Sequence, residues 1–193
     1  QTRDQYVIFY RFVEDGLRDQ LAARYGRAGL IFEGLRMARA ANYAAREGSE
    51  LQWWLHFLRR VGASRRINTE AMDSYIQQVA VEEPNRRRLL MPLALLAVSL
   101  LRRSATARRW LLDIQRQYSP TIYADLFERY RPALVVASTP GWRLDRYLLR
   151  EAAHRGVQTA TVIVGWDNPS SYGLPGAPVN WVTCWSEIQK QEL

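Results

Sequence analysis

The spacing of apolar residues in the last third of the chain changes from helical to strand-like twice. A helical pattern ends before Pro132, and a continuous apolar run follows at 133–137. A second helical pattern ends at Gly156, which is well placed as a C-terminal cap, and 157–164 has the composition of another strand. The pattern over 121–165 therefore predicts a parallel strand–helix–strand unit, as found in doubly wound sheets.

Two further expectations follow from this unit. The run at 133–137 shows no apolar–polar alternation, which predicts a strand buried on both faces. Parallel strands joined by a helix cross over right-handedly, so the loops after both strands lie at the same edge of the sheet. Open α/β sheets bind their ligands at that edge.

Further helices and strands are predicted in the first two thirds of the chain. The residues from Tyr6 to Tyr10 predict a strand, a helical pattern follows from Leu17, and 30–32 predicts a second short strand. Residues 36–118 are helical almost throughout, as an insertion or a thick helical layer. The whole chain, 1–193, is expected to form a single α/β domain with a Rossmann-like parallel sheet whose core unit is 119–193, and to be an excerpt of a longer protein.

Composition adds a strong positive charge to this picture. The chain has 48% hydrophobic residues, enough for a real core, and a formal net charge of +8. All of its 27 basic residues except Lys190 are arginines. Such a surface favours anionic partners, with a solvated basic surface as the alternative. The single cysteine, Cys184, excludes an intrachain disulfide framework.

The loop after the second predicted strand gathers groups that suit a sugar. Trp166 offers an aromatic face for the C–H surface of a ring, and short polar side chains that can bond hydroxyls surround it. The alternative is an Asx turn, in which Asp167 and Asn168 bond their own backbone and Pro169 fixes the bend. The groups of this loop are Trp166, Asp167, Asn168, Ser170, Ser171 and Gly173.

This loop carries a resemblance to a known group of proteins. Residues 131–193 resemble the end of the amino-terminal domain of GT-B-type glycosyltransferase-like and glycerophosphotransferase-like proteins of surface-polysaccharide biosynthesis. The shared features are a strand, a helix, a second strand, the step Trp166-Asp167-Asn168, a Ser pair, Gly173, and an apolar strand that ends in Trp185-Ser186. Pro169 and Tyr172 depart from the usual pattern, in which an aliphatic and a basic residue are common.

The resemblance implies a fold and a function. The fold would be two Rossmann-like domains facing across a cleft, with the nucleotide-sugar donor on a carboxy-terminal domain and this half on the acceptor side. Asp167 would be the general base or an anchor for the acceptor hydroxyl, and a structural role for it stays open. Trp166, Asn168 and Ser170 would position a glycan or lipid-linked acceptor, and Ser171 and Gly173 are further candidates for substrate binding. Apart from the resemblance, the first loop's Ser138, Thr139 and Gly141 are candidates too, because the free amides of a helix that begins just after Gly141 can hold a phosphate.

Other functions remain as alternatives. The apolar run within 86–103 is too short to span a bilayer and suits either a membrane surface, through its flanking arginines, or a core helix with arginines snorkelling at each end. Arginines interleaved with aromatic residues over 102–118 suit single-stranded nucleic acid, and a non-catalytic scaffold is a third alternative. We expect no cofactor and no metal site, because the chain lacks dinucleotide-binding, Walker and zinc-ligand spacings. A cytoplasmic protein, associated with a membrane surface if 86–103 binds there, is the expected localisation.

Overall fold

The computed structural model describes residues 6–10, 17–25, 30–34, 50–63, 70–82, 85–118, 121–141, 145–163 and 173–192. The chain divides into two compact units, unit 1 at Gln1–Ala41 and unit 2 at Asn42–Leu193.

Unit 1 holds a small strand–helix–strand arrangement. Strand β1 (Tyr6–Tyr10) pairs in parallel with β2 (Leu30–Gly34), and Tyr6 lies opposite Leu30 in the register. Helix α1 (Leu17–Tyr25) connects them, as a parallel pair requires. On this unit Phe32 is buried, and its ring centroid lies 6.4 Å from that of Tyr25. The predicted strands and helix of the first third are confirmed.

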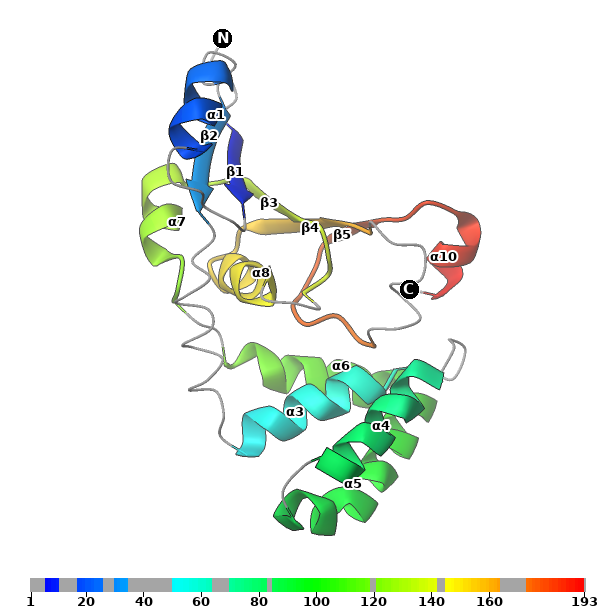
Figure 1. Cartoon of the computed structure of the whole chain (residues 1–193). Coiled ribbons are helices and arrows are strands. Elements are labelled where there is room, and N and C mark those ends of the chain that lie inside the picture. The colour runs from blue at the N-terminus through cyan, green and yellow to red at the C-terminus, as the bar shows by residue number, and fades with distance from the viewer. Residues whose placement is uncertain are drawn as a thin grey trace. The chain divides into compact units, whose positions relative to one another are not determined.

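Unit 2 contains the three-stranded parallel sheet that positions the candidate site. Its strands are β3 (Leu134–Ala137), β4 (Gln158–Val162) and β5 (Trp181–Thr183), with β4 in the centre. Ala137 lies opposite Thr161, so β3 and β4 end side by side. Helix α8 (Asp145–His154) connects β3 to β4 and packs against both (Figure 1). The predicted parallel strand–helix–strand unit is confirmed, and the chain is a mixed α/β protein.

The expectation that the strand at 133–137 is buried on both faces is wrong. Val135 and Ala137 are buried, whereas Leu134 and Val136 are 47% and 56% exposed. The physical reason is one-sided coverage, because α8 packs against β3 and β4 from one face. An apolar run therefore forms a strand here without both of its faces being covered.

The end of α8 is closed by the predicted glycine cap. Gly156 has φ +73°, and its amide donates to the carbonyl of Ala153 at 3.1 Å. The amide of Val157 donates to the carbonyl of Ala152 at 2.9 Å. These two bonds form a Schellman motif, in which glycine adopts the left-handed conformation without a steric penalty. The chain is thereby turned directly into β4.

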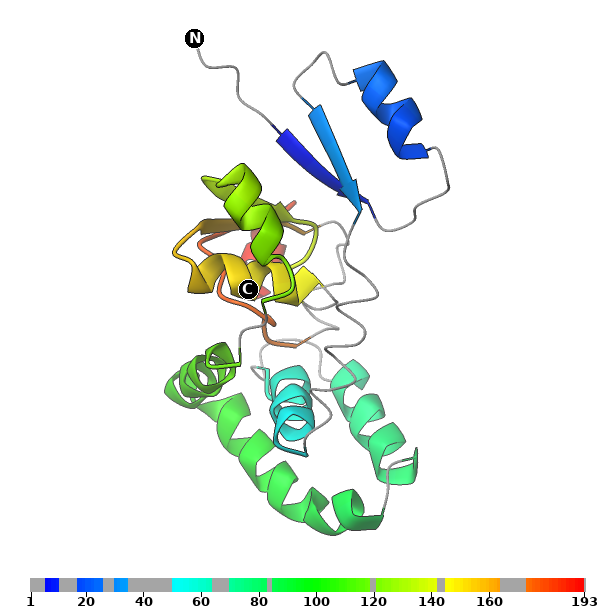
Figure 2. The same ribbon diagram turned by 90° about the vertical axis from the view of Figure 1, so that its left-hand side faces the viewer.

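Four helices form a layer within unit 2: α3 (Glu50–Val61), α4 (Glu70–Glu82), α5 (Asn85–Arg103) and α6 (Ala105–Arg116) (Figure 2). Two short helices, α7 (Ala124–Tyr130) and α10 (Glu187–Glu192), complete the described elements of this unit. Ser104 caps α6, since its hydroxyl accepts from the amide of Ala107 at 3.2 Å. The helical character predicted for 36–118 is confirmed where that range is described. One buried hydrophobic core of this layer is formed by apolar side chains of α3, α4 and α5: Phe57, Val61, Met72, Val79, Met91, Ala94 and Val98.

Candidate functional site

The carboxyl edge of the three-stranded sheet is where the sequence places the site. The loop 138–141 leaves this edge after β3, and Ile163, which follows β4, lies at the same edge. Five predicted site residues fall within 164–172 and lie outside the described residues: Trp166, Asp167, Asn168, Ser170 and Ser171. Ser138, Thr139, Gly141 and Gly173 are described.

The two residues that flank 164–172 are firmly anchored. Ile163 is fully buried, its amide donates to the carbonyl of Thr183 at 3.2 Å, and its carbonyl accepts from the indole of Trp185. Gly173 is buried at the other end, and the next amide, of Leu174, donates to the carbonyl of Arg59 at 3.1 Å. The described parts of unit 2 therefore fix where this loop leaves the sheet and where it returns.

The first loop is held to the start of α8. The hydroxyl of Thr139 donates to the carboxylate of Asp145, the first residue of that helix. Ser138 is exposed, whereas Pro140 and Gly141 are buried. A carboxylate in the first turn also suits the positive end of the helix dipole. Thr139 thus positions the loop, and Ser138 is the hydroxyl of this loop that faces solvent.

Close backbone packing joins this loop to the segment 173–177. The amide of Gly176 donates to the carbonyl of Pro140 at 2.9 Å. A Cβ atom at Gly176 would lie 1.8 Å from the carbonyl oxygen of Gly141, and one at Gly173 would lie 2.0 Å from that of Arg60. Side chains are excluded at such distances, so glycine is required where these backbones meet. Gly173, predicted as a ligand contact, is explained here by its packing on α3.

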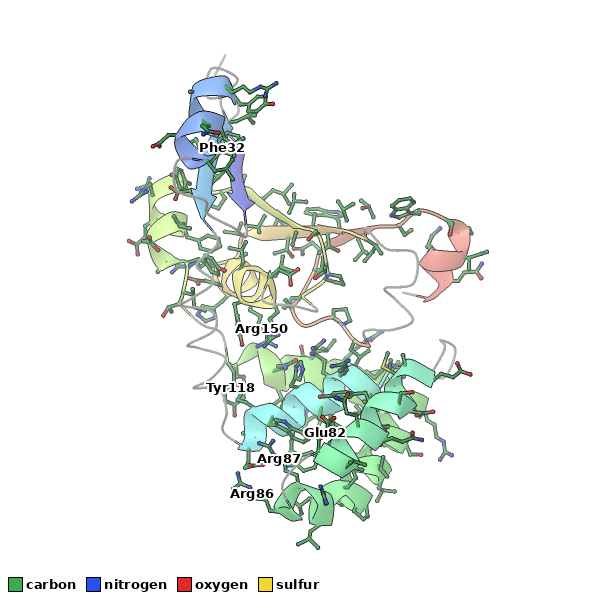
Figure 3. The ribbon with its side chains drawn as sticks, in the orientation of Figure 1. Phe32, Glu82, Arg86, Arg87, Tyr118 and Arg150 are labelled. Carbon is green, nitrogen blue, oxygen red and sulfur yellow. The ribbon has the colours of Figure 1, made fainter. Side chains whose placement is uncertain are left out.

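Arginines of α3 and α8 lie next to segment 173–177, and two of them bond its carbonyls. Arg59 on α3 donates through Nη1 to the carbonyl of Leu174, and Arg150 on α8 donates through Nε to the carbonyl of Gly176 at 2.6 Å. Arg146 has its Cβ beside Gly141, and Arg60 has its guanidinium 3.8 Å from the ring centroid of Tyr75. Figure 3 shows Arg150 extending from α8 towards the helical layer. We call Arg59, Arg60, Arg146 and Arg150 the arginine cluster.

The arginine cluster is strongly electropositive. Burial, followed by the positive charges of Arg146, Arg150 and Arg60, lowers the pKa of Arg59 to about 9. Arg59 is 1% exposed, and its Nε has no hydrogen-bond partner among the described residues. No carboxylate within the described part of the chain pairs with Arg59 or Arg60. The positive charge of Arg59 and Arg60 is therefore not neutralised by a described carboxylate, and such charge attracts anionic groups.

His56 lies beside the cluster but is not suited to proton transfer. Burial lowers its pKa to about 3, and the charge of Arg59 is the next cause. The Nη2 of Arg59 donates to Nδ1 of His56 at 3.2 Å, which requires the neutral ring with its proton on Nε2. A histidine that stays neutral through the physiological range is a hydrogen-bond acceptor here, not a general base that cycles near pH 7.

Sequence reasoning missed the arginine cluster and one buried hydroxyl. Arg59 is four residues after the buried Leu55, a spacing that places it on the inner face of α3, and this was the available signal. Thr161, near the carboxyl end of β4, is fully buried, and its Oγ1 has no partner among the described residues. No sequence pattern distinguishes such a threonine from a satisfied one.

Some of the arginines that the sequence offers for stacking on nucleic acid are bonded within the helical layer. Arg102 donates to Asp73 at 2.9 Å and to the carbonyl of Val61 at 3.0 Å, and Arg108 donates to the carbonyl of Leu101 at 2.7 Å. Both therefore bridge helices of the layer. Trp110 remains 67% exposed on α6. Only part of this set is thus presented on the surface.

One further pocket lies away from the predicted site. A pocket of about 500 Å³ lies at the amino end of β4, between Gly156 and Asn180, at the edge opposite the predicted site. Within the described residues, no group of three or more His, Cys, Asp or Glu side chains is placed to hold a metal ion. Cys184 is half-buried and has no disulfide partner, as expected for a chain with one cysteine.

Comparisons of the chain with protein-family models, with curated proteins and with solved structures found no match.

Proposed function

We propose that this chain is the acceptor-side half of a glycosyltransferase-like protein, which transfers a sugar from a nucleotide-sugar donor to a polysaccharide or lipid-linked acceptor. One observation carries the proposal: β3, α8 and β4 form a parallel unit whose two strands end at the same edge of the sheet. The second loop contains the Trp166-Asp167-Asn168 step that resembles the GT-B-type group.

In this proposal the finer fold is a Rossmann-like amino-terminal domain, and the donor binds mainly on a second domain. Asp167 receives the proton of the acceptor hydroxyl, or anchors that hydroxyl, while Trp166 and Asn168 position the sugar ring. The arginine cluster supports a substrate that carries phosphate, because Arg146 lies beside Gly141 of the first loop, Arg150 bonds the carbonyl of Gly176, and clustered positive charge attracts anions. A transferase of nucleotide sugars handles such substrates.

The test is nucleotide release from a panel of nucleotide sugars, with and without a polysaccharide or lipid-linked acceptor, by this half joined to the second, donor-binding domain. This half alone should be inactive or nearly so. We expect release that needs acceptor and falls at least about a hundredfold in Asp167→Asn, as for the loss of a general base. Asp19→Asn is the matched control, because Asp19 is an exposed carboxylate on α1. Folded protein that releases nucleotide from no donor, or an Asp167→Asn variant as active as Asp19→Asn, contradicts the proposal.

The second candidate is a module that binds anionic ligands, including single-stranded nucleic acid. The arginine cluster is the observation that favours it. Binding of labelled oligonucleotides measured over a range of salt concentrations separates the two functions, because phosphate-driven binding weakens steeply as salt rises. Tight, salt-dependent binding without turnover of any nucleotide sugar would favour this module over the transferase.

A further inference from the structure

Helix α5 presents a row of leucines to solvent. Leu89, Leu93, Leu96 and Leu100 are 81%, 67%, 68% and 61% exposed. Their spacing of four, three and four residues places all four on one face of the helix, which we call the leucine stripe. Large apolar side chains exposed together, in contrast to single ones, mark a surface that binds something.

The packing of the helical layer leaves this stripe unused. Met91, Ala94, Val98 and Leu101 lie on the opposite face of α5, and each is 7% exposed or less. They pack into the cores of the layer, so α5 is already held in place by that face. The alternative from sequence, a core helix with snorkelling arginines, accounts for the inner face of α5 and leaves the outer face unexplained.

Positive charge stands at both ends of the leucine stripe. Arg86, whose side chain is 71% exposed, lies at the amino end of α5, as Figure 3 shows, and contacts Glu50. Arg103 is exposed at the carboxyl end. The sequence of α5 contains no Asp or Glu between these two arginines. The surface thus combines an apolar strip with cationic ends and carries no acidic residue of its own.

We propose that the outer face of α5 binds the surface of an anionic membrane, with the leucine stripe immersed at the boundary between headgroups and acyl chains. An interfacial helix needs an apolar face that enters this boundary and arginines that meet anionic headgroups, and α5 supplies both. The helix lies in the plane of the membrane. Among the described residues no single helix is long and apolar enough to cross a bilayer, and the pair 86–103 and 105–115, which passes such a test jointly, is bent by 116°.

A second copy of the chain fits this surface less well. The spacing of the leucine stripe is that of a coiled-coil seam, but it extends over only about two heptads, whereas stable seams extend over at least about three. A stable interface also engages about 20 residues or more on each side. Charge also disfavours a second copy. A symmetric pair of leucine stripes would bring the arginines at the ends of the two α5 helices together, and α5 has no acidic residue to pair with them. An anionic lipid surface has the opposite charge.

The experiment is sedimentation of the protein with two kinds of vesicles, one of phosphatidylcholine alone and one of equal parts phosphatidylcholine and phosphatidylserine. We expect binding to the anionic vesicles that weakens with salt. The variant Leu93→Ser/Leu96→Ser should bind about a hundredfold more weakly, since each leucine contributes at least tenfold. Arg103→Gln should bind about fivefold more weakly. No turnover is measured, so this test stands or fails separately from the transferase proposal.

Two matched variants serve as controls. Ile188→Ser removes an equally exposed apolar side chain from α10, and Arg24→Gln removes an exposed charge from α1. Both should bind like the wild type. The proposal is overturned if the protein ignores anionic vesicles, or if the leucine variant binds them as the controls do. It is also overturned if the protein is a dimer in sedimentation equilibrium and the leucine variant alone is a monomer.

Discussion

Arg59 and His56, one turn apart on α3, are joined by a hydrogen bond from Nη2 of the arginine to Nδ1 of the histidine at 3.2 Å. Burial is the largest cause of the lowered pKa of His56, and the charge of Arg59 is the second. The same arginine reaches out of its helix to the carbonyl of Leu174. This pair therefore connects the interior of the helical layer with the segment that returns from the predicted site loop.

The protein should lose stability through His56 as the pH falls. The pKa of His56 is about 3 in the folded chain, against 6.5 for an ordinary histidine. Between pH 6.5 and pH 3 the unfolded chain therefore binds a proton at His56 that the folded chain does not bind. The contribution is complete above about pH 6.5 and is lost progressively as the pH falls towards 3, at up to about 1.4 kcal/mol per pH unit. Urea unfolding across this range should show a shallower loss for His56→Gln than for the wild type.

The control for this measurement is His154→Gln, which changes an exposed histidine at the end of α8. That variant should follow the wild-type profile. A His56→Gln profile that coincides with the wild type from pH 6.5 to 3 would show that His56 is not held neutral by its surroundings.

Replacing Arg59 should raise the pKa of His56, but not to the ordinary histidine value of 6.5. In Arg59→Met the nearest positive charge is removed, and it is the second cause of the lowered pKa. Burial is the largest cause and remains, so the pKa should settle between about 3 and 6.5. Titration of the imidazole proton signals by NMR, in a His154→Gln background, checks this. Arg109→Met, an exposed change on α6, should leave the titration where it was.

Much of the fold was predictable because local rules decide it. The cap at Gly156 and the turn from α8 into β4 follow from residues close in sequence, and both were predicted. The exposure of Val136 was not predictable, because it depends on which face of the sheet another element covers. The same limit applies to Leu93, whose outward direction is decided by the partners that α5 packs against.

The candidate site divides in the same way. That β3 and β4 end at the same edge of the sheet follows from the order of elements and could be predicted. Residues such as Asp167 lie outside the described part of the chain, so their share of the site stays a prediction. The arginine cluster could not be predicted, because Arg59 and Arg150 are 91 positions apart in the sequence and face the same segment only after folding. In a chain with 26 arginines, sequence alone does not separate a buried one from those in solvent.

Glu151 should tolerate glutamine far better than alanine. Its side chain is buried, Oε2 accepts from the amide of Tyr123 at 2.8 Å, and Oε1 accepts from Arg155 at 3.0 Å. Glu151→Ala leaves a buried amide without its acceptor and should cost about 3 kcal/mol in urea unfolding. Glu151→Gln keeps an acceptor for Tyr123 and should cost less. Glu128→Ala, an exposed change on α7, should cost almost nothing.

The pH dependence of these variants has a definite sign. Burial is the main cause that raises the pKa of Glu151 above its ordinary value of 4.5, so the folded chain holds this proton more tightly than the unfolded chain. The wild type should therefore lose stability relative to Glu151→Gln as the pH rises from about 4.5 through the raised pKa. A difference that is constant with pH would contradict the raised pKa.

Alanine at Gly173 should be far more damaging than alanine at Gly156, although both glycines have nearly the same backbone conformation. Their φ angles are +76° and +73°, so the conformational penalty is shared, about 1–2 kcal/mol. A Cβ at Gly156 meets nothing within 4 Å, whereas one at Gly173 would lie 2.0 Å from the carbonyl oxygen of Arg60. Because that atom belongs to the backbone of α3, it cannot yield as a flexible side chain can. Gly173→Ala should cost about 3 kcal/mol or more in urea unfolding, and equal losses in the two variants would show that segment 173–177 does not pack against α3 this closely.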